Sequence, residues 1–130
     1  MGWVAVFVAF AVSHMVGDYL FQTDWQACNK HGGLSRPGVS RRALCSHVAT
    51  YTLAYVPALI WLAGNLGGWV VGAALLIGVP HLVQDDGRLI GAYMARVKHL
   101  ELGVHPSVDR AVDQSFHIVA LFLLSLVVGS

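Results

Sequence analysis

The stretch WVAVFVAFAVSHMVGDYLFQ, residues 3–22, decides the fold because it is an apolar run that carries His14 and Asp18 near one end. A helix needs about 20 mostly apolar residues to cross a membrane. Residues four apart lie on one face of a helix, so His14 and Asp18 would present an imidazole and a carboxylate to the same neighbour. The stretch therefore predicts a spanning helix whose polar pair faces another part of the protein.

Composition extends the membrane prediction to the whole chain. Of its 130 residues, 56% are hydrophobic and only 12% are charged, which is too apolar for an ordinary soluble domain. We predict a single transmembrane domain over residues 1–130, an all-α integral membrane four-helix bundle. Its spans cover approximately residues 3–22, 43–63, 69–88 and 111–128, with long loops at about 23–42 and 89–110. Within the second loop, the run Ala92 to Leu102 is expected to form a short interfacial helix.

Basic residues predict the orientation. All eight lysines and arginines lie between the first and second spans or between the third and fourth. The positive-inside rule then places both long loops in the cytoplasm and both termini outside, as in a multi-pass protein of the inner (cytoplasmic) membrane. The basic loops suit an anionic lipid surface better than nucleic acid, so the lipid bilayer is the expected partner. A homo-oligomer or a larger membrane assembly is compatible with so short a chain.

Histidines and aspartates recur at one depth in the predicted bundle. The pairs His81 with Asp85 and Asp113 with His117 repeat the four-residue spacing, and His47 stands alone in the remaining span. At about 1.5 Å of rise per residue, the four histidines of these spans lie roughly 7 to 12 Å inside the cytoplasmic ends of their helices. A site that is built from four helices requires such a common depth.

These residue types indicate a metal site. Ionisable side chains inside a membrane are costly and usually mark function. Four imidazoles and three carboxylates suit one or two divalent ions, with zinc expected first and iron or manganese as alternatives. The predicted ligands are His14, Asp18, His47, His81, Asp85, Asp113 and His117. The competing interpretation is that each histidine donates to its neighbouring aspartate and the pairs only hold the helices together.

A short internal repeat bears on the number of ions. The run His14-Met-Val-Gly-Asp18 matches His81-Leu-Val-Gln-Asp85, and each run is followed by a basic loop and a span with a histidine. The halves can be interpreted as two tandem helical hairpins in parallel orientation. In that interpretation two similar half-sites face each other, which favours a dinuclear centre.

Other polar residues are candidates for supporting roles. Gln22, Gln114 and Asp86 lie next to the predicted ligands and are expected to orient them through hydrogen bonds. Lys30, Arg41 and Arg42 are candidates for holding an anionic head group at the cytoplasmic surface.

The whole pattern resembles a family of small bacterial and phage membrane proteins that is known as a domain of unknown function. The resemblance rests on His14-x-x-x-Asp18 with Tyr19 and Gln22, on Lys30 and the lone His47, on His81-x-x-x-Asp85, and on Asp113-Gln114-x-x-His117. It implies a membrane protein and no particular chemistry. Asp86 departs from the pattern, in which an apolar or small residue follows the second aspartate.

The chemistry of the predicted site favours hydrolysis. Two metals can activate water and clamp an in-line displacement, so we expect a metal-dependent hydrolase that acts on a lipid-linked or amphipathic (phospho)ester at the cytoplasmic interface. In this hypothesis Asp18, Asp85 and Asp113 are the catalytic candidates, and one carboxylate that is not bound to metal serves as general base. Two other classes stay open: a di-iron membrane oxidoreductase, and a non-enzymatic small subunit or ion permease that uses the same cluster.

Overall fold

The structure is a computed structural model that describes residues 2–130. Over this range the chain forms helices, turns and loops and no strand. The all-α prediction is therefore confirmed.

The first membrane-length helix changes from α-helical to π-helical winding between His14 and Asp18. Helix α1 spans Trp3–Met15 and continues as a π-helical segment, η1, over Val16–Phe21. Wider π-helical turns are frequent at functional sites. The chain then turns into the short helix α2, Asp24–Asn29, whose start is fixed by a capping box. The Thr23 hydroxyl accepts from the Gln26 amide, and the Gln26 side chain accepts from the Thr23 amide.

The predicted second span is divided into two helices. Helix α3 covers Val39–Ala54 and α4 covers Val56–Leu66, with a break at Tyr55. Pro57 occupies the first turn of α4, where its missing amide hydrogen costs nothing. The 3₁₀ turn η2 (Gly67–Trp69), which begins at Gly67 with a φ of 53° that suits glycine, leads into α5, Val70–Asp85.

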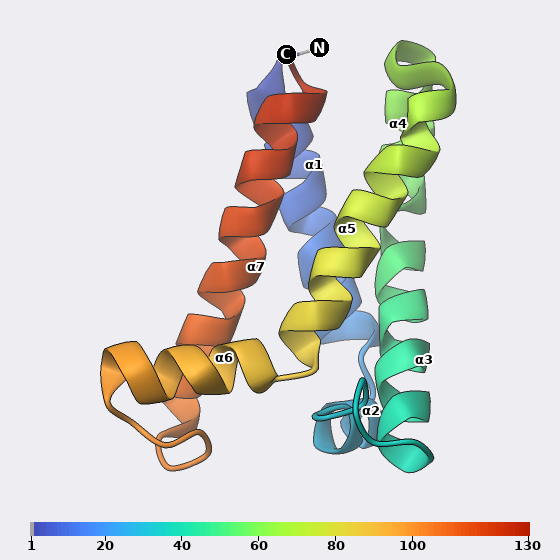
Figure 1. Cartoon of the computed structure of the whole chain (residues 1–130). Coiled ribbons are helices and arrows are strands. Elements are labelled where there is room, and N and C mark those ends of the chain that lie inside the picture. The colour runs from blue at the N-terminus through green and yellow to red at the C-terminus, as the bar shows by residue number, and fades with distance from the viewer. Residues whose placement is uncertain (1) are drawn as a thin grey trace.

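Three helical stretches are long and apolar enough to cross a membrane: Trp3–Phe21, Val56–Asp85 and Pro106–Val128. The second of them reverses direction at η2, so α4 and α5 lie side by side (Figure 1). Helix α3 is not among the three, because it has only 16 residues and carries Arg41 and Arg42 near its start.

A helical rod lies across the end of the molecule opposite the termini (Figure 1). It consists of α6, Arg88–Tyr93, and the π-helical segment η3, Met94–Lys98, and is followed by α7, Pro106–Val128. Ile90 and Met94 of the rod pack on Val112 of α7. The rod starts earlier than the expected helix at residues 92–102, because Gly87 makes the turn out of α5 with a φ of 82° and His99 already has a left-handed conformation.

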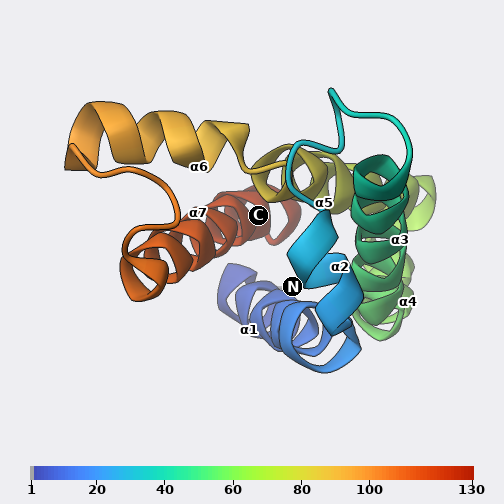
Figure 2. The ribbon, with the colours of Figure 1, turned by 90° about the horizontal axis from the view of Figure 1, so that it is seen from below.

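The interior has an apolar half and a polar half. The main core includes Val6 and Phe10 of α1, Leu62 of α4 and Leu121 of α7, and it fills the half toward the termini. Seen from the opposite end, α2 lies among α1, α3 and α5 (Figure 2). The polar residues considered below lie between this end and the apolar core.

Candidate metal centre

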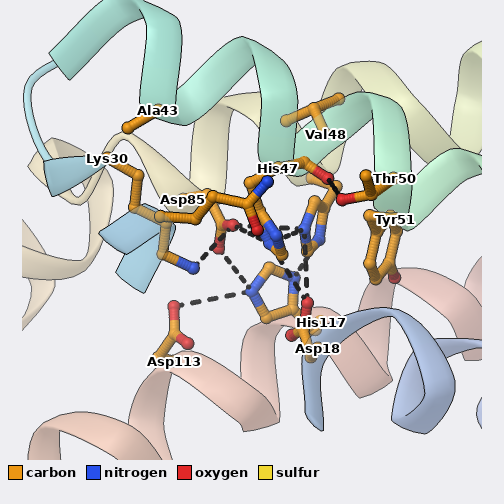
Figure 3. Close-up of polar contacts among 12 residues, drawn as sticks. Asp18, Lys30, Ala43, His47, Val48, Thr50, Tyr51, Asp85, Asp113 and His117 are labelled. Carbon is orange, nitrogen blue, oxygen red and sulfur yellow. Dashed lines mark hydrogen bonds and ion pairs between the residues drawn. The ribbon is translucent and has the colours of Figure 1, made fainter. Parts of the chain in front are cut away.

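Residues from four elements converge on one buried cluster (Figure 3). We call it the His/Asp cluster, and its members are Asp18 of η1, His47 of α3, His81 and Asp85 of α5, and Asp113 and His117 of α7. All three histidines and Asp85 are buried. The structure thus brings together six of the seven residues that were predicted as metal ligands.

One group of four potential ligands lies on the α3 and α5 side. Asp18, His47, His81 and Asp85 each offer one atom, and these atoms lie within 4.8 Å of one another. His47 Nε2 is 2.7 Å from Asp85 Oδ2 and 3.3 Å from Asp18 Oδ1, and His81 Nε2 is 3.1 Å and 3.5 Å from the same two oxygens. The Nε2 atoms of His47 and His81 are 3.0 Å apart. Two imidazoles and two carboxylates therefore face a common point.

A second group lies on the α7 side and shares Asp85 with the first. It consists of Asp85, Asp113 and His117. His117 Nε2 is 3.2 Å from Asp85 Oδ1 and 3.5 Å from Asp113 Oδ1. Asp85 thus turns Oδ2 toward the first group and Oδ1 toward the second, so it could serve as a ligand in both groups.

The chemistry of these residues fits divalent ions. Ligands about 2.1 Å from a zinc ion lie roughly 3.0 to 3.4 Å from each other, depending on the coordination geometry, and the distances above fall close to that range. Four buried atoms of the cluster residues have no hydrogen-bond partner within the described chain: Asp18 Oδ1, His47 Nδ1, Asp85 Oδ1 and His117 Nε2. All of these except His47 Nδ1 are among the atoms whose close contacts within the ligand groups are given above. Buried polar groups are normally satisfied, so the atoms in these contacts are suited to coordinate an ion.

His14, the seventh predicted ligand, lies beside the cluster and belongs to neither group. Its Nε2 donates to Gln114 Oε1 at 2.8 Å, and its Nδ1 lies 3.1 Å from the Tyr51 hydroxyl. Both ring nitrogens are therefore engaged. Gln114 in turn donates to Asp18 and Asp113 at 3.3 Å. His14 and Gln114 together orient two carboxylates, as hydrogen-bond partners behind a metal site do.

The sequence interpretation did not single out Tyr51 and Tyr55, which form the boundary between the cluster and the apolar core. The Tyr51 ring stacks on His81 with centroids 3.4 Å apart, and its hydroxyl lies 2.6 Å from that of Tyr55. The sequence does contain a signal for these tyrosines, because they follow His47 by four and eight residues and so lie on the same face of the helix. Gly17 permits this packing, since a Cβ there would lie 2.6 Å from Tyr51 Cδ2.

Lys30 reaches the cluster from the first loop. Its ammonium lies 2.8 Å from Asp85 Oδ2, and the side chain is buried (Figure 3). With its amide group turned so that both ends are satisfied, Gln22 accepts from Lys30 Nζ and donates to the Asp18 carbonyl oxygen. Gln22 thus supports Lys30 and the backbone of η1.

Asp86, Arg41 and Arg42 take other places than those expected from the sequence. Asp86 turns away from the cluster: its Oδ1 accepts from the Leu34 amide at 2.7 Å, and it pairs with Arg88. Neighbouring residues of a helix point about 100° apart, so Asp86 faces the first loop while Asp85 faces the cluster. Through its contact with the Leu34 amide, Asp86 holds this loop against the end of α5. Arg41 donates to the carbonyl oxygens of Gly33 and Leu34, and Arg42 is exposed on α3.

Fold and site together define a class of protein: an all-helical, multi-pass membrane protein with a buried His/Asp cluster that could hold a metal. The chain belongs to the family DUF3307, described as "Protein of unknown function (DUF3307)", whose model matches residues 6–130. This confirms the resemblance that was drawn from the motifs. No curated protein and no solved structure matches the chain.

Proposed function

We propose that the protein is a membrane-embedded dinuclear metal hydrolase that acts on a lipid-linked or amphipathic phosphoester. The observation that carries this proposal is the position of Asp85, which belongs to both potential ligand groups. A shared carboxylate supports two adjacent ions, and paired ions are suited to phosphoester hydrolysis. Zinc is the first candidate, because imidazole and carboxylate ligands both suit it, and manganese is the second.

In such a reaction, the residues of the cluster would bind the ions and accept a proton. A pair of divalent ions would activate water as the nucleophile and stabilise charge on a phosphoryl oxygen. Asp18, Asp85 and Asp113 would hold the ions together with the three histidines of the cluster. Asp113 is the most exposed acid of the cluster, with 28% of its side chain accessible. Its Oδ1 faces His117 and would bind the ion of the second group, and its Oδ2, to which Gln114 donates, would accept the proton of the attacking water.

Access to the cluster favours a hydrolase over a permease. A cavity of about 430 Å³ lies beside the cluster and is lined in part by Asp18 and Asp113. On the side toward the termini, the cluster is followed by the buried core with Phe10, Tyr55 and Leu121. A transported ion would have to cross this apolar layer, whereas a substrate can reach the metal groups from the cavity.

A di-iron oxidoreductase is the second candidate, and one observation favours it. Tyr51 stacks on His81 and forms a hydroxyl pair with Tyr55, so two oxidisable rings lie directly against the ligand groups. The same histidine and carboxylate ligands suit iron. Iron content and visible absorption that changes with reduction would distinguish this candidate from a zinc hydrolase.

Metal analysis of the detergent-purified protein tests the proposal. We expect two equivalents of zinc or manganese by elemental mass spectrometry and, in the loaded protein, release of phosphate or alcohol from a phosphoester presented in mixed micelles. Two equivalents of iron would instead favour the di-iron oxidoreductase. A protein that binds no ion even after reconstitution would refute both and leave the cluster as a structural network.

The membrane arrangement is part of the proposal. We propose four spans, α1 with η1, α3 with α4, α5, and α7, built as two tandem hairpins with both long loops in the cytoplasm and both termini outside. Asp18 and Asp85 support the repeat, because each lies four residues after a histidine and each approaches both His47 and His81. The bilayer and a lipid-like substrate are then the partners, and further subunits are compatible with the exposed apolar helices.

Cysteine labelling tests this topology. Gly68 is suited to carry the probe, because it is exposed and a Cβ there would meet nothing within 4 Å. In a chain whose native cysteines, Cys28 and Cys45, are replaced by serine, Gly68→Cys should react with a membrane-impermeant reagent added to intact cells. Native Cys28, which is exposed on α2, should react only after the cells are opened. The opposite result would invert the topology and move the chemistry to the other face.

A further inference from the structure

The cavity beside the His/Asp cluster connects the two groups of potential ligands to the surface of the protein. Its wall includes Asp18 and Asp113 of the cluster and their hydrogen-bond partner Gln114. The Asp18 side chain is only 4% exposed, and its Oδ1 has no hydrogen-bond partner in the described chain. A molecule in this cavity would therefore lie directly against the first ligand group.

Two cationic side chains line the same cavity at different depths. Arg110 is exposed, and within residues 2–130 its guanidinium forms no ion pair. Lys30 is buried and pairs with Asp85. The neighbouring acid Asp109 also lines the cavity: its Oδ2 accepts from the Gly103 amide at 2.6 Å, its Oδ1 has no hydrogen-bond partner in the described chain, and neither oxygen pairs with Arg110. Arg110 is thus free to bind an anion.

The Lys30 ammonium lies where a metal ion in the first ligand group would bind. Asp85 Oδ2, its partner at 2.8 Å, is also the oxygen closest to His47 Nε2 and His81 Nε2. Like charges a few ångströms apart repel each other strongly in a buried site, where water screens them little. An ion in the first group would therefore weaken the Lys30–Asp85 pair, and the cavity is the free volume into which Lys30 can turn.

The cavity also has an apolar wall. Ile90 of α6, Leu102 of the second loop and Pro106 at the start of α7 line it, and Tyr19 of η1 adds an aromatic ring. Leu102 and Tyr19 are 42% and 56% exposed. A ligand that fits this cavity has an anionic group for the cations and an apolar part for this wall.

We infer that the cavity binds the phosphoryl group of an amphipathic ligand between Arg110 and Lys30, next to the metal groups. The inference rests on the proposed function and names its substrate contacts. A guanidinium binds phosphoryl oxygens in a bidentate manner, and a lysine ammonium supplies a point charge. Lys30 thus keeps the role that the sequence predicts for it, and Arg110 takes the place of Arg41 and Arg42.

The test compares phosphate and metal binding in matched variants. Inorganic phosphate is titrated calorimetrically into the metal-loaded protein in detergent. Arg110→Gln should weaken phosphate binding about 10- to 100-fold, the value of a charge-assisted hydrogen bond, and leave metal affinity unchanged. Arg42→Gln, the same change outside the cavity, should alter neither affinity.

Lys30→Gln separates the inferred role from a structural one. It should weaken phosphate binding and raise metal affinity, because the competing ammonium is gone; Lys30→Arg should restore phosphate binding. A Lys30→Gln protein that is folded by size exclusion but has lost metal would show that Lys30 only holds the site together, and would overturn the inference. Equal phosphate affinity in native, Arg110→Gln and Arg42→Gln proteins would also overturn it.

A second arm distinguishes the sources of the phosphoryl group. Binding to nanodiscs with phosphatidic acid in phosphatidylcholine is compared with binding of inorganic phosphate, each in native and Arg110→Gln protein. Tighter binding to the phosphatidic acid discs, lost in Arg110→Gln, identifies a lipid head group; equal binding identifies free phosphate. If the chain holds ions but binds neither ligand through Arg110, only the inference fails. If it holds no ion yet binds phosphate through Arg110, the anion site stands and the proposed function fails.

Discussion

Asp85→Asn is expected to remove both metal ions at once. Asp85 is the one residue common to the two ligand groups, and an amide is a much weaker metal ligand than a carboxylate. The change also leaves the buried Lys30 ammonium without its partner, and breaking a buried ion pair costs about 3 to 5 kcal/mol. Elemental mass spectrometry should show a fall from two equivalents to nearly none, together with a lower melting temperature in detergent.

The adjacent acid provides a matched control for this experiment. Asp86 is as buried as Asp85, at 2% exposure each, but contacts the first loop and Arg88. Asp86→Asn should keep both ions even if it loosens the loop, and Asp85→Glu should keep measurable metal because it retains a carboxylate. One full equivalent of metal in folded Asp85→Asn would mean that the two groups do not share this ligand.

His81→Ala and Asp113→Ala should each remove one ion, and not the same one. His81 contributes only to the group with Asp18, His47 and Asp85, whereas Asp113 contributes only to the group with Asp85 and His117. Each variant should therefore retain about one equivalent of metal, and both should lose hydrolysis, because the proposed mechanism uses both ions.

The double variant and a loop histidine complete this test. His81→Ala combined with Asp113→Ala should bind no metal, while His99→Ala, in the second loop, should bind as the native protein does. His14→Ala is expected to weaken binding about 10- to 100-fold without abolishing it, as removal of a hydrogen-bond partner of a metal site does. Loss of both ions in each single variant would instead indicate one undivided site.

Much of the candidate site could be predicted because its pattern is local. The four-residue spacing of His81 with Asp85 and of Asp113 with His117 places each pair on one helical face, whatever the rest of the fold does. The common depth of the histidines followed from the helical rise alone. These two regularities identified the six residues that the structure brings into the cluster.

The contacts that the sequence could not supply join residues far apart or in irregular segments. Lys30 and Asp85 are 55 positions apart and meet only because α2 folds back under the helices. His14 was predicted as a ligand, but Gln114 and Tyr51 occupy both of its nitrogens. Arg41 is held by the carbonyl oxygens of Gly33 and Leu34, in a loop whose path no periodicity determines.

The sequence by itself determined that this chain is helical, apolar enough for a membrane and provided with histidine and aspartate at one level, because helix periodicity and hydropathy act on neighbouring residues. Only the tertiary structure decided that Asp85 faces the cluster while Asp86 faces the loop, and that Asp85 turns one oxygen to each ligand group. Helical geometry separates such neighbours by about 100°. Which of them points inward depends on how α5 is rotated against α3 and α7, and that rotation is set by packing over the whole molecule.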